Sequence, residues 1–264
     1  MEEHYIVQVQ SQVQGLVDDL KAVFTHAGLA GEAAEYKLLT QSFLYKFLND
    51  KFLYEALNID ESYDYQGLLN LSEEDYDWFL DDIGTKTAHL KPEQLIESLH
   101  RQQNQADFAE IFEQTLNQIA IDNNAIFSVH TDGGTDIRLF DQRLITDTIS
   151  DTSKRNEVAA SIINLLARVK FDQQIFSQGF DFFSTLFEYM IKDYNKDGGG
   201  KYAEYYTPHS VAKIIAAILV GNDQPSNVKI YDPSAGSGTL LMNLASQIGT
   251  DRTSVYSQDI SQKS

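Results

Sequence analysis

The stretch Val228-Lys229-Ile230-Tyr231-Asp232-Pro233-Ser234-Ala235-Gly236-Ser237-Gly238, residues 228–238, decides the fold of the C-terminal third of this 264-residue chain. Its first four residues predict a short strand, and its small, glycine-rich remainder predicts a tight turn. Leucines at helical spacing predict a helix over residues 239–248, which Gly249 ends. A second strand over residues 255–258 is followed by Asp259. This order predicts a parallel strand–helix–strand unit.

The turn and the acid after the second strand predict a nucleotide or nucleoside site. Small residues let the backbone approach a ligand at the carboxyl edge of the sheet, and Asp259 lies 21 residues after Gly238, where an acid accepts hydrogen bonds from ribose hydroxyls. The turn is not G-x-G-x-x-G, and it begins with Asp232, which would repel a pyrophosphate. An acid there favours a ligand with a cationic amino group, such as S-adenosylmethionine. An ordinary turn with chance glycines is the alternative.

The rest of the chain is predicted to be mainly helical. Thr207 is expected to cap a helix that has Pro208 in its first position and stops at Gly221. A hairpin is expected near residues 126–140, around Asp132-Gly133-Gly134, and 195–200 is expected to be a flexible loop. Apolar residues at steps of three and four predict further helices over 13–24, 32–57, 92–103, 106–119, 155–169 and 182–194.

Composition and charge narrow the class of protein. A content of 42% hydrophobic and 22% charged residues is typical of a globular protein, and the absence of cysteine excludes disulfides and thiolate sites. No signal segment or long apolar run is present, so we expect a cytoplasmic protein without a membrane span. The net charge is −19, and residues 1–150 hold 27 acids and 9 bases. Residues 58–82 carry nine acids and no base, which predicts a loop-rich, solvated face or one that docks a basic partner.

Three motifs together resemble one family of enzymes. They are Glu204-Tyr205-Tyr206-Thr207-Pro208, the turn Asp232-Pro233-Ser234-Ala235-Gly236-Ser237-Gly238 and Gln258-Asp259. They are similar to the motifs of amino-methylating DNA methyltransferases and, more narrowly, of the modification (M) subunit of type I restriction–modification systems. Residues 187–191 (FEYMI) and 43–50 (FLYKFLND) also resemble that family. The resemblance is strong over 184–259 and weak over 58–180.

The resemblance implies a fold, an activity and partners. The fold would be a mainly helical N-terminal domain, residues 1–170, followed over 171–264 by the start of a Rossmann-like class I methyltransferase domain with a truncated parallel sheet. The activity would be methylation of adenine N6 with S-adenosylmethionine as cofactor. The partners would be DNA, reached mainly through a specificity (S) subunit, a second M subunit and a restriction (R) subunit.

The resemblance also assigns cofactor-binding residues by position. Tyr206, Thr207 and Pro208 would line the methionine end of the cofactor, flanked by Glu204, Tyr205 and His209. Asp232 would face the amino group, Gly236, Ser237, Gly238 and Thr239 would form the close backbone turn, and Asp259 would hold the ribose. Plainer roles stay open, because Tyr205 and Tyr206 also suit a core and His209 also suits a solvated helix start.

The sequence departs from the family at its catalytic motif, N/D-P-P-F/Y. None of the four prolines is adjacent to another, so the motif is absent, and the chain is expected to be an N-terminal part of a longer protein without catalytic residues of its own. No metal site is expected. Two other functions stay open: a methyltransferase of RNA or protein, and an acidic adaptor module without catalysis.

Overall fold

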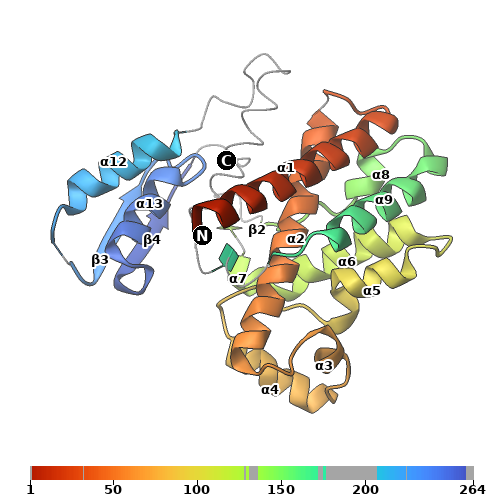
Figure 1. Ribbon diagram of the computed structural model, residues 1–264, viewed down its shortest axis with the longest axis horizontal. Helices are drawn as coiled ribbons and strands as arrows, with labels where there is room; N and C mark the ends of the chain where they lie inside the picture. Colours follow the sequence, from red (N-terminus) through yellow and green to blue (C-terminus); the bar gives the residue numbers. More distant parts are fainter. Residues whose placement is uncertain are drawn as a thin grey trace. The chain divides into compact units, whose positions relative to one another are not determined.

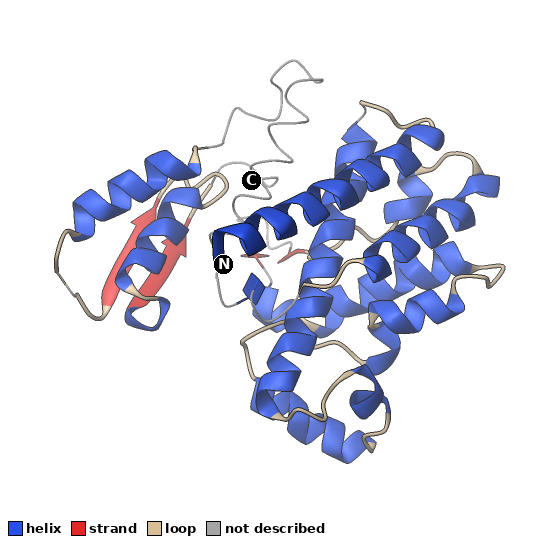
Figure 2. Ribbon diagram, in the orientation of Figure 1, coloured by secondary structure: helices blue, strands red, loops and turns tan. Residues whose placement is uncertain are grey.

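The computed structural model describes residues 2–31, 33–127, 129–130, 136–171, 175–176, 207–223 and 225–259. The chain separates into two compact units, residues 1–177 and 178–264. Helices dominate the described residues, and the strands form two separate pairs (Figures 1 and 2). The predicted helix over 182–194 and the predicted loop over 195–200 lie outside the described residues.

Among its described residues, the first unit is helical apart from one short hairpin, β1 (Val129–His130) and β2 (Asp136–Ile137), whose strands pair antiparallel as predicted. The hairpin is shorter than predicted, because Ile126 and Phe127 belong to a helix, α7 (Asn124–Phe127). The α-helices of the unit are α1 (Glu2–His26), α2 (Ala33–Ile59), α3 (Tyr65–Leu69), α4 (Glu73–Ile83), α5 (Ile96–Gln102), α6 (Phe108–Asp122), α7 (Asn124–Phe127), α8 (Leu144–Thr148) and α9 (Arg155–Arg168). Two 3-10 turns, η1 (Pro92–Gln94) and η2 (Thr152–Lys154), precede α5 and α9.

The core of this unit is built around α9, which packs against α1, α2, α5, α6 and α8 (Figure 1). Ile162 and Leu166 of α9 are completely buried, and so are Phe112 and Leu116 of α6. Apolar residues three and four apart on one helix share a face, so each helix presents a continuous stripe to its neighbours. The helices over 13–24, 32–57, 106–119 and 155–169 that the periodicity predicts are therefore confirmed.

Two predictions in this unit are wrong in detail. The single helix expected over 92–103 is broken at Leu95, which has an extended backbone between η1 and α5. The amide of Ile96 donates instead to Oδ1 of Asn49 on α2, at 2.9 Å. The stretch 58–82 is not loop-rich either, because α3 and α4 each begin with a side-chain cap, Asp64 and Ser72 respectively.

A buried polar cluster lies on α2 within the stretch 43–50. The ammonium of Lys46 contacts Asp50 at 2.8 Å, and both side chains are at least 93% buried. Asp50 also accepts hydrogen bonds from Nδ2 of Asn49 at 2.7 Å and from the amide of Phe171 at 2.8 Å. The Lys46 ammonium lies 5.5 Å from the centre of the Phe171 ring. The cluster therefore ties the segment after α9 to α2.

The second unit contains the predicted strand–turn–helix–strand order. It consists of α12 (His209–Val220), β3 (Val228–Asp232), α13 (Thr239–Ile248), the 3-10 turn η3 (Thr250–Arg252) and β4 (Thr253–Ser257). β3 and β4 pair in parallel, with Val228 opposite Thr253 and Asp232 opposite Ser257. The parallel unit is thus confirmed, although the second strand begins two residues earlier than the sequence predicts.

The two helices of this unit pack against each other and, through α13, against the sheet. Their shared core consists of Val220, Ile230, Leu241, Ala245 and Ile248. Tyr231 and Tyr256 are directly paired and point to the opposite face of the sheet from Ile230, because side chains alternate along a strand. Both tyrosines are more than half exposed.

Candidate cofactor site

The turn after β3 has a backbone shape that its glycines make possible. Gly236 and Gly238 have φ angles of 52° and 71°, in the left-handed region that side chains with a Cβ rarely adopt. Gly238 is the N-cap of α13, and its carbonyl accepts the first helical hydrogen bond, from the amide of Met242 at 3.0 Å. The amide of Gly238 donates to the carbonyl of Ala235 at 2.8 Å, which closes the turn. The chain therefore passes directly from strand to helix.

The end of β4 is joined to this turn by three hydrogen bonds. The amide of Gln258 donates to the carbonyl of Asp232, and the amide of Ala235 donates to the carbonyl of Gln258, both at 2.9 Å. The amide of Gly236 donates to Oδ2 of Asp259 at 2.8 Å. The structure therefore brings the acid after the second strand and the glycine turn together at one edge of the sheet.

The second acid of this edge is Asp232, at the end of β3. Its Oδ1 accepts a hydrogen bond from the amide of Ser234 at 3.0 Å, and its side chain is partly exposed. Residues 230–251 contain no lysine or arginine, while Lys229 and Arg252 lie near the opposite ends of β3 and β4. The carboxyl edge of the sheet therefore carries negative charge, which disfavours a phosphate group.

Two hydroxyls complete the turn. Oγ of Ser237 and Oγ1 of Thr239 lie 2.8 Å apart, and Thr239, the first residue of α13, is buried. The Ser237 side chain is exposed. Of the two predicted turn hydroxyls, Ser237 is thus the one that solvent reaches.

The helix that follows the Thr207-Pro208 pair begins differently from the prediction. Pro208 is the N-cap, with ψ of 134°, and His209 is the first helical residue. The carbonyl of Pro208 accepts hydrogen bonds from the amides of Val211 and Ala212, at 3.0 and 3.1 Å. Thr207 lies one residue before the N-cap, and the N-cap residue, Pro208, makes no side-chain cap hydrogen bond. The expectation that Thr207 caps the helix and that Pro208 is its first residue is therefore wrong.

His209 is buried, with 7% of its surface exposed, so the idea of a solvated histidine is wrong. Its Nδ1 lies 3.0 Å from Nδ2 of Asn243, which is also buried and belongs to α13. Sequence reasoning overlooked Asn243. The available signal was a polar residue among the apolar residues of a short helix, where burial requires a hydrogen-bond partner.

Three predicted site residues, Glu204, Tyr205 and Tyr206, lie outside the described residues. The other nine are described. Seven of them are connected by the turn, by β4 or through Asn243. These seven are Asp232, Gly236, Ser237, Gly238, Thr239, His209 and Asp259. Thr207 and Pro208 directly precede His209.

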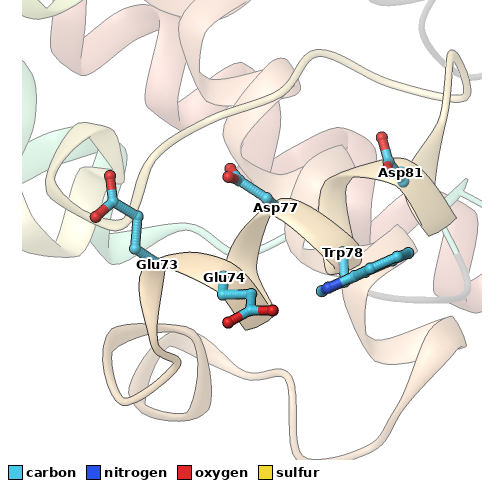
Figure 3. Close-up of a pocket in the computed structure, with 5 residues that line it drawn as sticks. All are labelled: Glu73, Glu74, Asp77, Trp78 and Asp81. Atoms are coloured by element: carbon cyan, nitrogen blue, oxygen red, sulfur yellow. The ribbon is translucent and has the colours of Figure 1, made fainter.

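The acidic stretch forms a separate surface on α4. Glu73, Glu74, Asp77, Trp78 and Asp81 line an open hollow of about 570 Å³, and Figure 3 shows all five side chains projecting from the helix. Trp78 is 67% exposed, whereas Tyr65, Tyr76 and Phe79 are buried. Among the described residues, no ion pair involves an acid of α4. Acids in the first turn of a helix are favoured by its dipole, which explains Glu73 and Glu74 without a ligand.

Two further features are absent from the described part of the chain. No cluster of three or more histidine, aspartate or glutamate side chains could hold a metal ion there. None of the described helices combines the length and the hydropathy needed to span a bilayer.

Comparisons with known proteins show what this chain is similar to. Residues 178–264 match the family model of the N-6 DNA methylases. The chain is 30% identical over 83 residues to the methylase subunit of the type I restriction enzyme MpnII of Mycoplasma pneumoniae. That alignment covers 30% of this chain and 15% of the relative.

A solved structure extends the comparison to the whole fold. The methyltransferase subunit of the type I restriction–modification system of Streptococcus thermophilus superposes with a TM-score of 0.65 at 20% identity. It matches 97% of this chain, and this chain spans 53% of that protein. The predicted resemblance is therefore confirmed: the C-terminal part carries the pattern of an N-6 DNA methylase, and the chain is similar to type I methylase subunits.

Proposed function

We propose that this chain binds S-adenosylmethionine and serves the methylation of adenine N6 in DNA, as part of the methyltransferase subunit of a type I restriction–modification system. One observation carries the proposal. The amide of Gly236 in the turn after β3 donates to the carboxylate of Asp259 after β4, at 2.8 Å. The two elements that the motifs assign to one cofactor are therefore in contact, although 22 residues separate them. In Rossmann-like folds, ligands bind at this carboxyl edge of the sheet.

The residues present fit that cofactor. The left-handed glycines let the backbone approach a ligand without a Cβ in between. Among the described residues, the edge offers two carboxylates and no lysine or arginine, which suits a ligand with an ammonium group and a ribose and is unfavourable for a pyrophosphate. A carboxylate can accept about four hydrogen bonds, so the bond from Gly236 is compatible with ribose hydroxyls at Asp259.

We assign each part of the cofactor to residues of this chain. Asp259 would accept hydrogen bonds from the ribose hydroxyls, and Asp232 would face the ammonium group. The turn over 236–239 would contact the cofactor through its backbone. The methionine end would lie against residues 204–208, beside His209. When bound, the cofactor supplies an electrophilic methyl group, and these residues hold and orient it.

The target base requires other residues. No N/D-P-P-F/Y motif occurs among these 264 residues, so we propose no catalytic residue here. Residues 151–264 hold 12 acids and 11 bases, so this part repels DNA far less than the strongly acidic first part. We propose that residues 1–170 form the helical domain and that residues 171–264 belong to the Rossmann-like methyltransferase domain. We also propose that a specificity subunit bound to two M subunits reads the DNA sequence, and that a restriction subunit is a further partner.

Calorimetric titration of the full protein with S-adenosylmethionine tests the proposal. We expect the substitutions Asp259→Ala and Gly236→Leu to abolish binding, because the first removes the ribose acceptor and the second forces a Cβ into a left-handed turn. Asp251→Ala is the matched control, since Asp251 is exposed in η3 near the opposite end of the sheet. Unchanged affinity in both site variants would refute the assignment. Binding without methylation of adenine in DNA would favour an RNA or protein substrate, and no binding would favour an adaptor.

A further inference from the structure

We propose that the buried pair His209–Asn243 positions the two halves of the cofactor site relative to each other. This inference rests on the proposed function, and it changes the role of His209 from a cofactor contact to a positioning residue. His209 is the first residue of α12 and directly follows Thr207-Pro208. Asn243 lies one helical turn after Thr239, the first residue of α13, which directly follows the glycine turn.

The hydrogen bonds of Asn243 define its orientation. Its Nδ2 donates to the carbonyl of Thr239 at 2.7 Å, and it lies 3.0 Å from Nδ1 of His209. A flipped amide would place its oxygen against the Thr239 carbonyl, so the nitrogen must face that carbonyl. An amide nitrogen only donates, so Nδ1 of His209 accepts, and the ring proton is on Nε2. One amide group thus connects the start of α13 to the start of α12.

The apolar contacts between the two helices are less directional than this hydrogen bond. The buried apolar residues of α12 are Ala212, Ala216 and Val220, and apolar contacts have little directional preference. Burying two polar side chains is unfavourable unless they are paired, whereas an apolar pair would avoid that penalty. The directional hydrogen bond lies at the start of α12, next to Thr207-Pro208. It therefore fixes how far α12 lies along its own axis and how it is rotated about that axis at this end.

This position gives a specific expectation for ligands. The Thr207-Pro208 element is assigned to the methionine end of the cofactor, and Asp259 to the ribose. Disrupting the pair should therefore weaken binding of S-adenosylmethionine more than binding of 5′-methylthioadenosine, which lacks the amino-acid end. A role in stability alone would change both affinities by the same factor.

The test uses calorimetry on the full protein with both ligands, together with thermal unfolding. We expect His209→Ala and Asn243→Leu to weaken S-adenosylmethionine about tenfold, as the loss of one buried hydrogen bond would, and 5′-methylthioadenosine by less than twofold. The double variant should be no weaker than either single variant, and His209→Gln, which keeps an acceptor, should recover part of the affinity. Val220→Ala, at the far end of α12, is the control that lowers stability without changing the ratio of affinities.

Two outcomes would overturn the positioning role. One is an equal loss for both ligands. The other is additive effects in the double variant. Nitrogen-15 spectra of the His209 ring provide a measurement that does not depend on a ligand: we expect a proton on Nε2, and a proton on Nδ1 would refute the geometry. If the unaltered protein binds neither ligand while the ring has the expected tautomer, the proposed function fails and the positioning role fails with it.

Discussion

Removing the Asp50 carboxylate should destabilise the helical unit strongly. Asp50 is 93% buried and accepts hydrogen bonds from Lys46, Asn49 and the amide of Phe171. The substitution Asp50→Ala leaves a buried ammonium and two buried donors without their acceptor. Loss of one partner of a buried pair typically costs about 3–5 kcal/mol, a large part of the roughly 5–15 kcal/mol that stabilise a domain.

The effects of substituting Lys46 and Asp50 on the free energy of unfolding should not be additive, because the two side chains interact. Burial lowers the pKa of Lys46, and the attraction of Asp50 only partly opposes this effect. Lys46→Met leaves the buried Asp50 carboxylate without its countercharge but with its hydrogen bonds from Asn49 and Phe171, so it should destabilise by about 3 kcal/mol, at the low end of that range. The double variant should be about 2 kcal/mol more stable than the sum of the single effects, because no uncompensated ammonium remains.

Denaturant unfolding followed by far-ultraviolet circular dichroism measures these free energies, since the helical unit dominates that signal. The control is Glu97→Ala, which removes an exposed pair with Arg101 of the same i,i+4 spacing and should change the free energy of unfolding by less than about 0.5 kcal/mol. A cost below about 1 kcal/mol for Asp50→Ala, or strict additivity in the double variant, would refute the reasoning. Amide exchange at Phe171 should also accelerate in Asp50→Ala, because its acceptor is gone.

Two further predictions concern the tyrosines and the single tryptophan. Burial raises the pKa of Tyr45 and Tyr76, so the unfolded chain loses these protons near pH 10 while the folded chain keeps them. The free energy of unfolding should therefore fall above pH 10, by about 1.4 kcal/mol per pH unit for each tyrosine. The variant Tyr45→Phe should reduce that slope. Trp78 is exposed on an acidic helix, which attracts cations and repels anions. Caesium ions should therefore quench its fluorescence more than iodide ions do, and 1 M salt should reduce the difference. Stronger quenching by iodide would contradict this electrostatic explanation.

The candidate cofactor site was largely predictable where its residues are close in the sequence. The turn over 232–238 and the helix after it follow from glycine conformation and apolar periodicity, which are local properties. Asp259 was predictable because the length of a strand–helix–strand unit sets its distance from the turn. Its hydrogen bond to Gly236 depends on the parallel register of β3 and β4, which only the folded chain defines.

The start of α12 shows where local reasoning failed. Threonine before proline is typical of a helix cap, yet Pro208 itself is the cap, because its backbone stays extended and its carbonyl accepts the first helical bonds. The burial of His209 depends on α13, whose Asn243 is 34 residues away. No local rule indicates that partner.

In the helical unit, too, local features were predictable and contacts between distant residues were not. Periodicity predicts α1, α2, α6 and α9 because each needs only its own apolar stripe. It does not predict the break at Leu95, since Ile96 is capped there by Asn49, from a different helix. It does not explain the buried Lys46 either, whose partner Asp50 also binds the distant Phe171.

By itself, the sequence determined the helices with strong periodicity, the glycine turn, the parallel strand–helix–strand unit and the resemblance to type I methylase subunits. These depend on side-chain pattern and backbone preference over short distances, which a linear sequence records. Only the tertiary structure decided which buried polar groups meet: Gly236 with Asp259, His209 with Asn243, and Asp50 with Lys46 and Phe171. Such pairs form because a polar group removed from water requires a partner, and the packing of whole elements selects it.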